Sequence, residues 1–241
     1  FDSLEASLRA VAAEIGRPRA ALVVSGHWES DRFTVQSGDR PGMIYDYGGV
    51  PREMYEIRYP APGAPEVAHR VRDLLQEAGI PSALDPDRGY DHGTFAPLKA
   101  MYPEADVPIV QVSLKHGYDP AEHLALGRAL KPLRSEGVVI LGSGLSWHNL
   151  RMLGPAAKPS SSAFDAWLDE TLSAPPEERT PRLLDWERAP AARLSHPSED
   201  HFIPLMVALG AAEEEAASRV YHEADFMGGI TASSYRFGTP R

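Results

Sequence analysis

Histidines at strand ends are the residues of this chain best suited to chemistry. His27 follows the apolar run of residues 20–25. His148 follows a second such run, residues 138–141, and His92 lies in a polar turn after a third. Short continuous apolar runs predict strands that are buried on both faces of a sheet. Open α/β sheets bind their ligands at the carboxyl ends of the strands, so we expect these imidazoles to meet at one sheet edge.

Two further histidines flank the start of a predicted helix. The sequence from Ser198 to residue 211 predicts a helix that Ser198 caps, with Asp200 near its positive end and His201 in its first turn. His196 lies just upstream. A single histidine in such a place more often bonds a neighbouring carbonyl group. The similar placement of the other histidines favours a shared pocket.

Metal binding is the chemistry that such a cluster supports. Several imidazoles in one pocket suit a first-row divalent ion, and neutral imidazole binds iron(II) or zinc. Another histidine beside the ion could shuttle protons, while Glu29 or Asp200 could orient a ligand or bind the ion directly. The chain has no cysteine, so thiolate metal sites are excluded. It also lacks the HExxH, GxGxxG, GxxxxGK[ST] and GxSxG motifs, so distant segments must assemble the site.

The bulk composition narrows the class of protein. The 241 residues are 43% hydrophobic and 24% charged, which is typical of a soluble globular domain. A formal net charge of −10 argues against nucleic acid or an anionic membrane as a partner. No apolar run reaches the ~18 residues of a membrane span, and no signal peptide pattern is present. We therefore expect a cytoplasmic protein.

Strand and helix patterns alternate along the whole chain. Apolar residues at helical spacing predict helices at 3–15, 65–78, 96–101, 120–133 and 164–172. A charged turn is expected at 175–180, followed by a further short helix at 183–191. Strand patterns occupy residues 20–25, 33–37, 80–84, 107–113, 138–141 and 220–222. No internal repeat or linker interrupts them. The alternation predicts a single three-layer α/β/α domain over residues 1–241, with a mostly parallel or mixed central sheet.

A tyrosine-rich loop spans residues 42–63. Such long loops in compact domains are often functional. Packing of the loop by its own rings is the plainer interpretation for most of these tyrosines. Candidates for substrate or rim contacts are Tyr45, Tyr47, Arg52 and, near the end of the chain, Arg236.

Six motifs follow one another in the chain, at residues 23–29 (VVSGHWE), 45–51 (YDYGGVP), 91–95 (DHGTF), 142–150 (GSGLSWHNL), 196–205 (HPSEDHFIPL) and 235–238 (YRFG). In this order they resemble the class III extradiol ring-cleaving dioxygenases, specifically the 4,5-DOPA dioxygenase-like branch. The resemblance covers nearly the whole chain, and the ordered set is more specific than any single motif.

The resemblance implies a role for each histidine. His27 and His201 would bind one divalent ion per chain, Fe(II) or Zn(II). His148 would be the acid/base residue beside the ion, and His92 and His196 would line the substrate side of the pocket. The family also has an early histidine ligand in a Ser-His-Gly-Ser-Pro-like turn after its first strand. That first strand and turn are missing here, so we expect residues to precede this sequence.

By the same resemblance, the enzyme is a non-haem metal-dependent dioxygenase. It would use O2 to open a catechol-type aromatic ring to a semialdehyde, while His148 takes a phenolic proton and later donates one. Two alternatives stay open: a zinc protein of the same fold that performs metal-assisted hydrolysis, and a non-catalytic binding relative. Assembly into a homo-oligomer is compatible with the sequence, although no heptad repeat shows how copies would pair.

Overall fold

A five-stranded sheet forms the centre of the computed structural model, which describes residues 1–239. Its strands are β1 (Ala20–Ser30), β2 (Phe33–Gln36), β3 (Ser82–Asp85), β4 (Ile109–Lys115) and β5 (Val138–Ser143). Their order in the sheet is β3-β2-β4-β1-β5. β1 is parallel to β4 and β5, whereas β2 is antiparallel to β4 and parallel to β3. The sheet is therefore mixed, in agreement with the predicted fold class.

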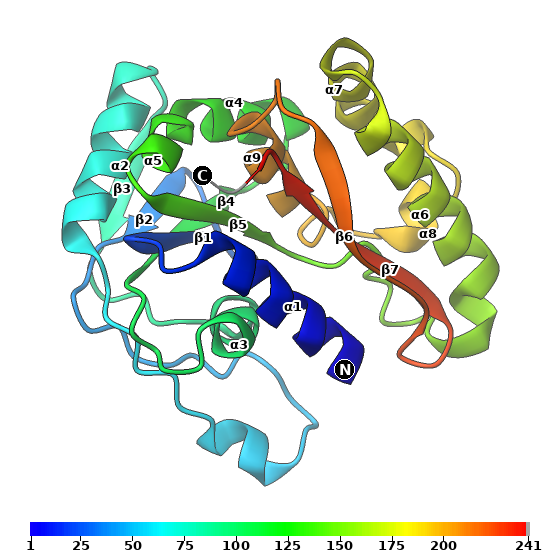
Figure 1. Cartoon of the computed structure of the whole chain (residues 1–241), viewed down its shortest axis with the longest axis horizontal. Coiled ribbons are helices and arrows are strands. Elements are labelled where there is room, and N and C mark those ends of the chain that lie inside the picture. Colours follow the sequence, from blue (N-terminus) through cyan, green and yellow to red (C-terminus); the bar gives the residue numbers. More distant parts are fainter. Residues whose placement is uncertain (240–241) are drawn as a thin grey trace.

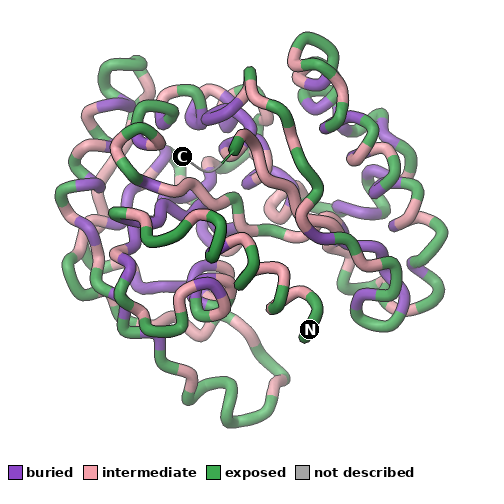
Figure 2. The backbone as a smooth tube through the Cα atoms, in the orientation of Figure 1, coloured by how far each residue is buried: buried purple, intermediate pink, exposed green. Residues whose placement is uncertain are grey.

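Alternate residues of β1 enter two different cores, because successive side chains of a strand point to opposite faces. Leu22 and Val24 belong to the larger core, and Ala21 and Val23 belong to the smaller one. All four are fully buried, and Figure 2 shows the buried backbone concentrated in the sheet and in the inner faces of the helices. Burial on both faces explains why the run reads as continuously apolar.

Helices cover both faces of the sheet (Figure 1). The larger core is closed by α2 (Pro65–Glu77), α4 (Pro120–Leu130), α6 (Lys158–Ser173) and α9 (Pro204–Gly210), and the smaller core by α1 (Asp2–Ile15) and α3 (His92–Met101). Shorter helices are α5 (Pro132–Ser135), α7 (Pro176–Leu184), α8 (Ala192–Ser195) and the 3-10 turns Arg52–Glu56, Gly154–Ala157 and Trp186–Arg188. This is the three-layer arrangement expected from the sequence.

A separate hairpin, which the sequence patterns did not predict, follows the central sheet. Strands β6 (Ala217–Phe226) and β7 (Ile230–Phe237) pair in antiparallel fashion. The expected strand at residues 220–222 is thus only the middle of β6. The hairpin passes between α1 and α6 (Figure 1) and buries Phe226 and Ile230 against Trp147. Burial is irregular along β6, and β7 begins with three consecutive buried residues, so neither strand shows a period-2 pattern.

Three predicted helix starts are wrong by more than one residue. The helix expected at residues 164–172 begins at Lys158. The helix expected at residues 96–101 begins at His92, because Asp91 caps it by accepting a hydrogen bond from the Thr94 amide at 3.1 Å. The helix expected to begin at Ser198 instead begins at Pro204. Pro204 has no amide to donate to the carbonyl of Asp200, so a continuous helix through both residues would lose that bond.

The segment after α6 also differs from the prediction. The expected charged turn at residues 175–180 is mostly helix α7, which starts with a proline at its first position, where a missing amide costs nothing. The expected helix at residues 183–191 is replaced by the end of α7 and the 3-10 turn Trp186–Arg188, and α8 begins only at Ala192. None of the helices within residues 1–239 combines the length and apolar character that crossing a bilayer requires.

Leu22 provides a test of the core. Its side chain is fully buried in β1, so Leu22→Ala should lower the free energy of unfolding by about 2–5 kcal/mol. Leu150 is 65% exposed, and the matched change Leu150→Ala should stay within about 0.5 kcal/mol of the parent. Urea unfolding measures both. Equal effects of the two changes would contradict the burial described for β1.

Candidate active site

Four histidines from distant segments, which we expected to share one pocket, meet at one place. The ring centroids of His92 and His27 are 4.0 Å apart, and those of His27 and His201 are 4.7 Å apart. His148 stacks on His201 with the centroids 3.3 Å apart and the planes 12° from parallel. The four imidazoles therefore form one continuous cluster.

His27 lies inside β1, not beyond its end as predicted. The register between β1 and β4 shifts between Val24 and Glu29, which is the irregularity of a bulge, and bulges re-aim side chains. The residue before the histidine is Gly26, where a Cβ atom would lie 2.8 Å from the carbonyl oxygen of Asp200. The glycine allows β1 to approach the segment that carries His201.

His201 lies in the turn before α9, and the end of β5 holds that turn in place. The Leu145 amide donates a hydrogen bond of 3.1 Å to the His201 carbonyl oxygen. A Cβ atom on Gly144 would overlap the same carbonyl oxygen, so glycine is required for this approach. The glycine-rich segment after β5 thus positions His201 as well as leading to His148.

Two carboxylates hold the rings from behind. Asp46 Oδ2 lies 3.1 Å from His27 Nδ1, and Asp46 Oδ1 lies 2.7 Å from His92 Nδ1. Asp200 Oδ2 lies 2.6 Å from His201 Nδ1. Burial raises the pKa of Asp46, but hydrogen bonds from His27 and His92 outweigh burial and hold the pKa well below its usual range. The pKa of Asp200 is likewise held low, against burial, chiefly by its bond with His201.

The free imidazole nitrogens of the cluster are arranged as a metal ion requires. Because the Nδ1 atoms of His27 and His201 donate to carboxylates, their Nε2 atoms are left as acceptors, and these two atoms face each other at 3.1 Å. Two unprotonated nitrogens repel unless a cation lies between them. Imidazole nitrogens that bind one ion at about 2.0–2.1 Å stand roughly 3 Å apart. Carboxylates behind ligating imidazoles are the usual support of such sites.

The side chains that could hold an ion form two adjoining groups. His27, Asp46 and His92 make one, and His148, Asp200 and His201 make the other, each with possible ligand atoms within 4.8 Å of one another. The contact between the Nε2 atoms of His27 and His201 joins the groups. We assign Asp46 to support rather than to ligation, because both of its oxygens already face ring nitrogens. Asp200 supports His201 through Oδ2, whereas its Oδ1 is buried without a hydrogen-bond partner.

Comparison with known proteins decides the family. The chain matches the family described as the catalytic LigB subunit of aromatic ring-opening dioxygenase over residues 1–238. It belongs to that family. LigB subunits are catalytic, and this chain is accordingly an aromatic ring-opening dioxygenase.

Curated relatives and a solved structure agree with the LigB assignment. The chain is 41% identical to the 4,5-DOPA dioxygenase extradiol of Beta vulgaris and 36% identical to that of Escherichia coli K12, in each case over 92% of this chain and 83% of the relative. It is 38% identical to dioxygenase tasH of Hapsidospora irregularis, over 92% and 72%. A crystal structure of an uncharacterised Escherichia coli K12 protein superposes with a TM-score of 0.80 at 31% identity, covering 97% and 92% of the two chains.

His148 has the surroundings of a neutral base within this LigB fold. Burial, reinforced by the nearby charge of His201 and opposed by Asp200, lowers the pKa of His148 to about 4. Its backbone amide donates to the Ser195 carbonyl oxygen at 2.9 Å. At neutral pH the ring is therefore uncharged and can accept a proton.

His196 does not line the pocket as predicted. Its side chain is fully buried, with Nε2 3.1 Å from the Ser146 carbonyl oxygen. The rings of Phe164, Trp186 and Phe202 surround it with centroids 5.2–6.0 Å away. His196 thus supports the Ser146 backbone, two residues before His148, from inside the core.

The Tyr45 hydroxyl is bound by other residues of its own loop and not by the histidine cluster. It donates to the Ile57 carbonyl oxygen at 2.6 Å and accepts a hydrogen bond from Arg58. The neighbouring Tyr47 instead reaches the cluster, with its ring centroid 5.3 Å from that of His92. Glu29, a candidate supporting carboxylate, lies elsewhere and pairs with His116 at 3.5 Å.

Asp46 is the residue that the sequence patterns missed. It lies in the tyrosine-rich loop, between Tyr45 and Tyr47, where an acidic residue suggests only a solvated turn. The available signal was the motif at residues 45–51, whose order relative to the histidine motifs places the loop in the same site.

His196 makes the stability of the protein depend on pH. Burial lowers its pKa to about 3, whereas an unfolded histidine titrates near about 6.5. Below about pH 6.5 the unfolded chain binds a proton that the folded chain excludes. The free energy of unfolding is therefore undiminished by this group above about pH 6.5, and it falls toward about pH 3 by up to about 1.4 kcal/mol per pH unit. His196→Gln, which retains a donor for the Ser146 carbonyl oxygen, should flatten this slope.

Urea unfolding between about pH 7 and about pH 4.5 measures the slope. His69 is exposed, so His69→Gln is the matched control and should leave the slope as in the parent. An unchanged slope in His196→Gln would show that the proton uptake belongs to other groups.

Proposed function

We propose that this LigB-family enzyme is an extradiol dioxygenase that cleaves a catechol-type ring with O2 and depends on one divalent ion. The single observation that carries the proposal is the pair of Nε2 atoms of His27 and His201, 3.1 Å apart and each backed by a carboxylate. Two of the relatives are named 4,5-DOPA dioxygenase extradiol, which supports the substrate class.

His27 and His201 would hold the ion, and we propose iron(II). Ligands that are all imidazole suit iron and zinc alike, but zinc has no redox chemistry. When bound, iron(II) supplies the redox chemistry by which the ring and O2 exchange electrons. Two imidazoles leave open positions for further ligands and for the two oxygens of a catechol.

His148 would move the protons of the reaction. Its neutral ring stacks on His201 and would lie beside the oxygens of a catechol bound at this centre. Its Nε2 takes one phenolic proton and returns it during ring opening. Catechol and O2 together contain every atom of the semialdehyde product, so the proton is only borrowed and no further reductant is needed.

His92 and the tyrosine-rich loop would form the substrate side. Asp46 fixes the His92 ring, and Tyr47 covers it from the loop. Tyr45 and His196 would act on the pocket indirectly, Tyr45 by bracing the loop and His196 by bracing the backbone before His148.

The direct test is a ring-cleavage screen. Protein is first loaded with ferrous ion under anaerobic conditions and then supplied with O2 and one catechol: DOPA, protocatechuate, homoprotocatechuate or gallate. It should consume O2 and form a coloured semialdehyde, which absorbance measures. Metal analysis of the same sample should find iron. A protein that carries zinc and consumes no O2 with any catechol would contradict the proposal.

Loss of a ligand should remove the ion. His27→Ala deletes one of the two facing nitrogens, so the protein should lose most of its bound iron, as measured by elemental analysis. His69→Ala removes an exposed histidine from α2 and should retain the iron content of the parent. Equal iron in both variants would mean that His27 is not a ligand.

Asp46 should tune the affinity for the ion without binding it. Asp46→Asn keeps the shape but weakens the acceptor behind His27, and loss of such a support typically lowers metal affinity about 10–100-fold. Competition with a chelator measures the change. Asp39 is an exposed acidic residue, and Asp39→Asn should leave the affinity unaltered. Complete loss of binding in Asp46→Asn would instead make Asp46 a direct ligand.

Removal of the proton carrier should separate binding from turnover. His148→Ala should retain iron but lower kcat about 10²–10⁴-fold, the usual contribution of general acid–base catalysis. Parallel measurement of iron content and O2 uptake distinguishes this result from loss of the ion. Cleavage at the parent rate would refute the role of His148.

A further inference from the structure

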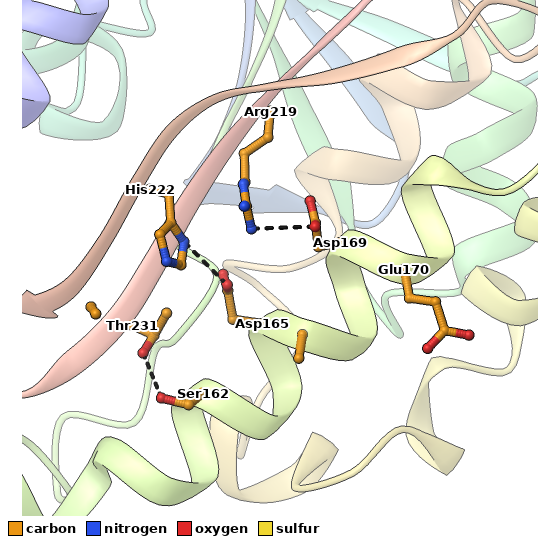
Figure 3. A pocket seen from close by; sticks show the side chains of 9 residues that line it. Ser162, Asp165, Asp169, Glu170, Arg219, His222 and Thr231 are labelled. Carbon is orange, nitrogen blue, oxygen red and sulfur yellow. Dashed lines mark hydrogen bonds and ion pairs between the residues drawn. The ribbon is translucent and has the colours of Figure 1, made fainter.

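A pocket lies between helix α6 and the β6–β7 hairpin, outside the histidine cluster. It has a volume of about 380 Å³, within the range of small-molecule sites. Figure 3 shows side chains from α6 facing those from the hairpin across it. The side chains that matter here are Ser162, Asp165, Ala166, Arg219, His222 and Thr231.

Asp165 is the unusual residue of this pocket. Its side chain is only 4% exposed, and its Oδ1 atom is buried with no hydrogen-bond partner. The other oxygen lies 3.4 Å from His222 Nδ1, a nitrogen that is also 3.0 Å from the Ser233 hydroxyl. A buried carboxylate is costly unless cations or donors compensate it, so this group calls for a ligand.

The other carboxylates around the pocket already have partners. Asp169 Oδ2 lies 3.3 Å from Arg219 Nη1, and the Tyr235 hydroxyl donates to Asp169 Oδ1 at 3.3 Å. Glu170 lies 3.2 Å from Arg182 Nη1. Asp165 is therefore the carboxylate of this pocket whose charge is left for a ligand to neutralise.

The surroundings favour an organic cation over a metal ion. Within residues 1–239, the clusters with three metal-ligand atoms lie at the histidine site and not here. The fixed guanidinium of Arg219 across the pocket would repel a dication more strongly than a single charge. A cavity of about 380 Å³ also exceeds what a bare ion fills.

We propose that this pocket binds a small primary ammonium ion. Its –NH3⁺ group would donate to Asp165, and the Ser162 and Thr231 hydroxyls, which hydrogen-bond each other at 2.8 Å, offer further acceptors. Ala166 supplies apolar surface for a short alkyl chain. The pocket is thus a second binding site for amines, separate from the ring-cleaving centre.

Calorimetric titration of the intact protein with n-butylammonium at neutral pH tests the proposal. We expect saturable binding in the millimolar range or tighter, and binding at least tenfold weaker for n-butanol, which has the same chain without the charge. Magnesium and zinc chloride form the third arm, measured on protein with the histidine site already loaded. Equal binding of the alcohol, or binding of the metal ions in place of the amine, would overturn the proposal.

Variants tie the binding to this pocket. Asp165→Asn should weaken butylammonium binding at least tenfold, while Asp39→Asn removes the same charge from an exposed loop and should have no effect. Ala166 is exposed on α6, so Ala166→Leu should fold normally and block the pocket sterically. This second variant tests the site even if Asp165→Asn proves unstable. Parent-like binding in Ala166→Leu would overturn the assignment.

Discussion

The facing Nε2 atoms of His27 and His201 are the constraint around which the rest of this structure is arranged. They lie 3.1 Å apart, and two unprotonated nitrogens remain so close only when the surrounding structure holds them. Each ring is fixed through its Nδ1 by a carboxylate, Asp46 on one side and Asp200 on the other. The carboxylates come from a loop and from the turn before α9, so the geometry depends on the whole sheet edge.

A buried polar network ties β1 to α3 behind the site. Asp91 accepts hydrogen bonds from the Ser25 hydroxyl at 2.7 Å and from the Thr94 amide, and it pairs with Arg88 at 3.0 Å. Arg88 in turn lies over the Trp28 ring, 4.9 Å from its centroid. Buried hydrogen bonds of this kind rigidify the segments that they join, although Arg88 Nε is left without a partner. The segments joined here carry His27 and His92, so the network helps to position both rings.

The histidines of this chain suit different roles because their surroundings differ. His27 and His201 have a carboxylate at one nitrogen and an open second nitrogen, which suits ligation. His148 stacks beside them and is kept neutral, mainly by burial. His196 is enclosed by aromatic rings and bonds only to backbone, so it serves packing. Only the positions of carboxylates and apolar rings distinguish these environments.

Sequence alone determined the layered α/β class and most element positions, because strand and helix periods are local properties of the chain. The placement of histidines after predicted strands raised the expectation of one shared pocket. The sequence could not determine the bulge that puts His27 within β1, the start of α9 at Pro204, the burial of His196 or the support by Asp46. Each of these depends on which distant segment packs against the residue. Asp46 and His27 are neighbours only because the loop folds over the sheet edge, and the tertiary structure alone decides that contact.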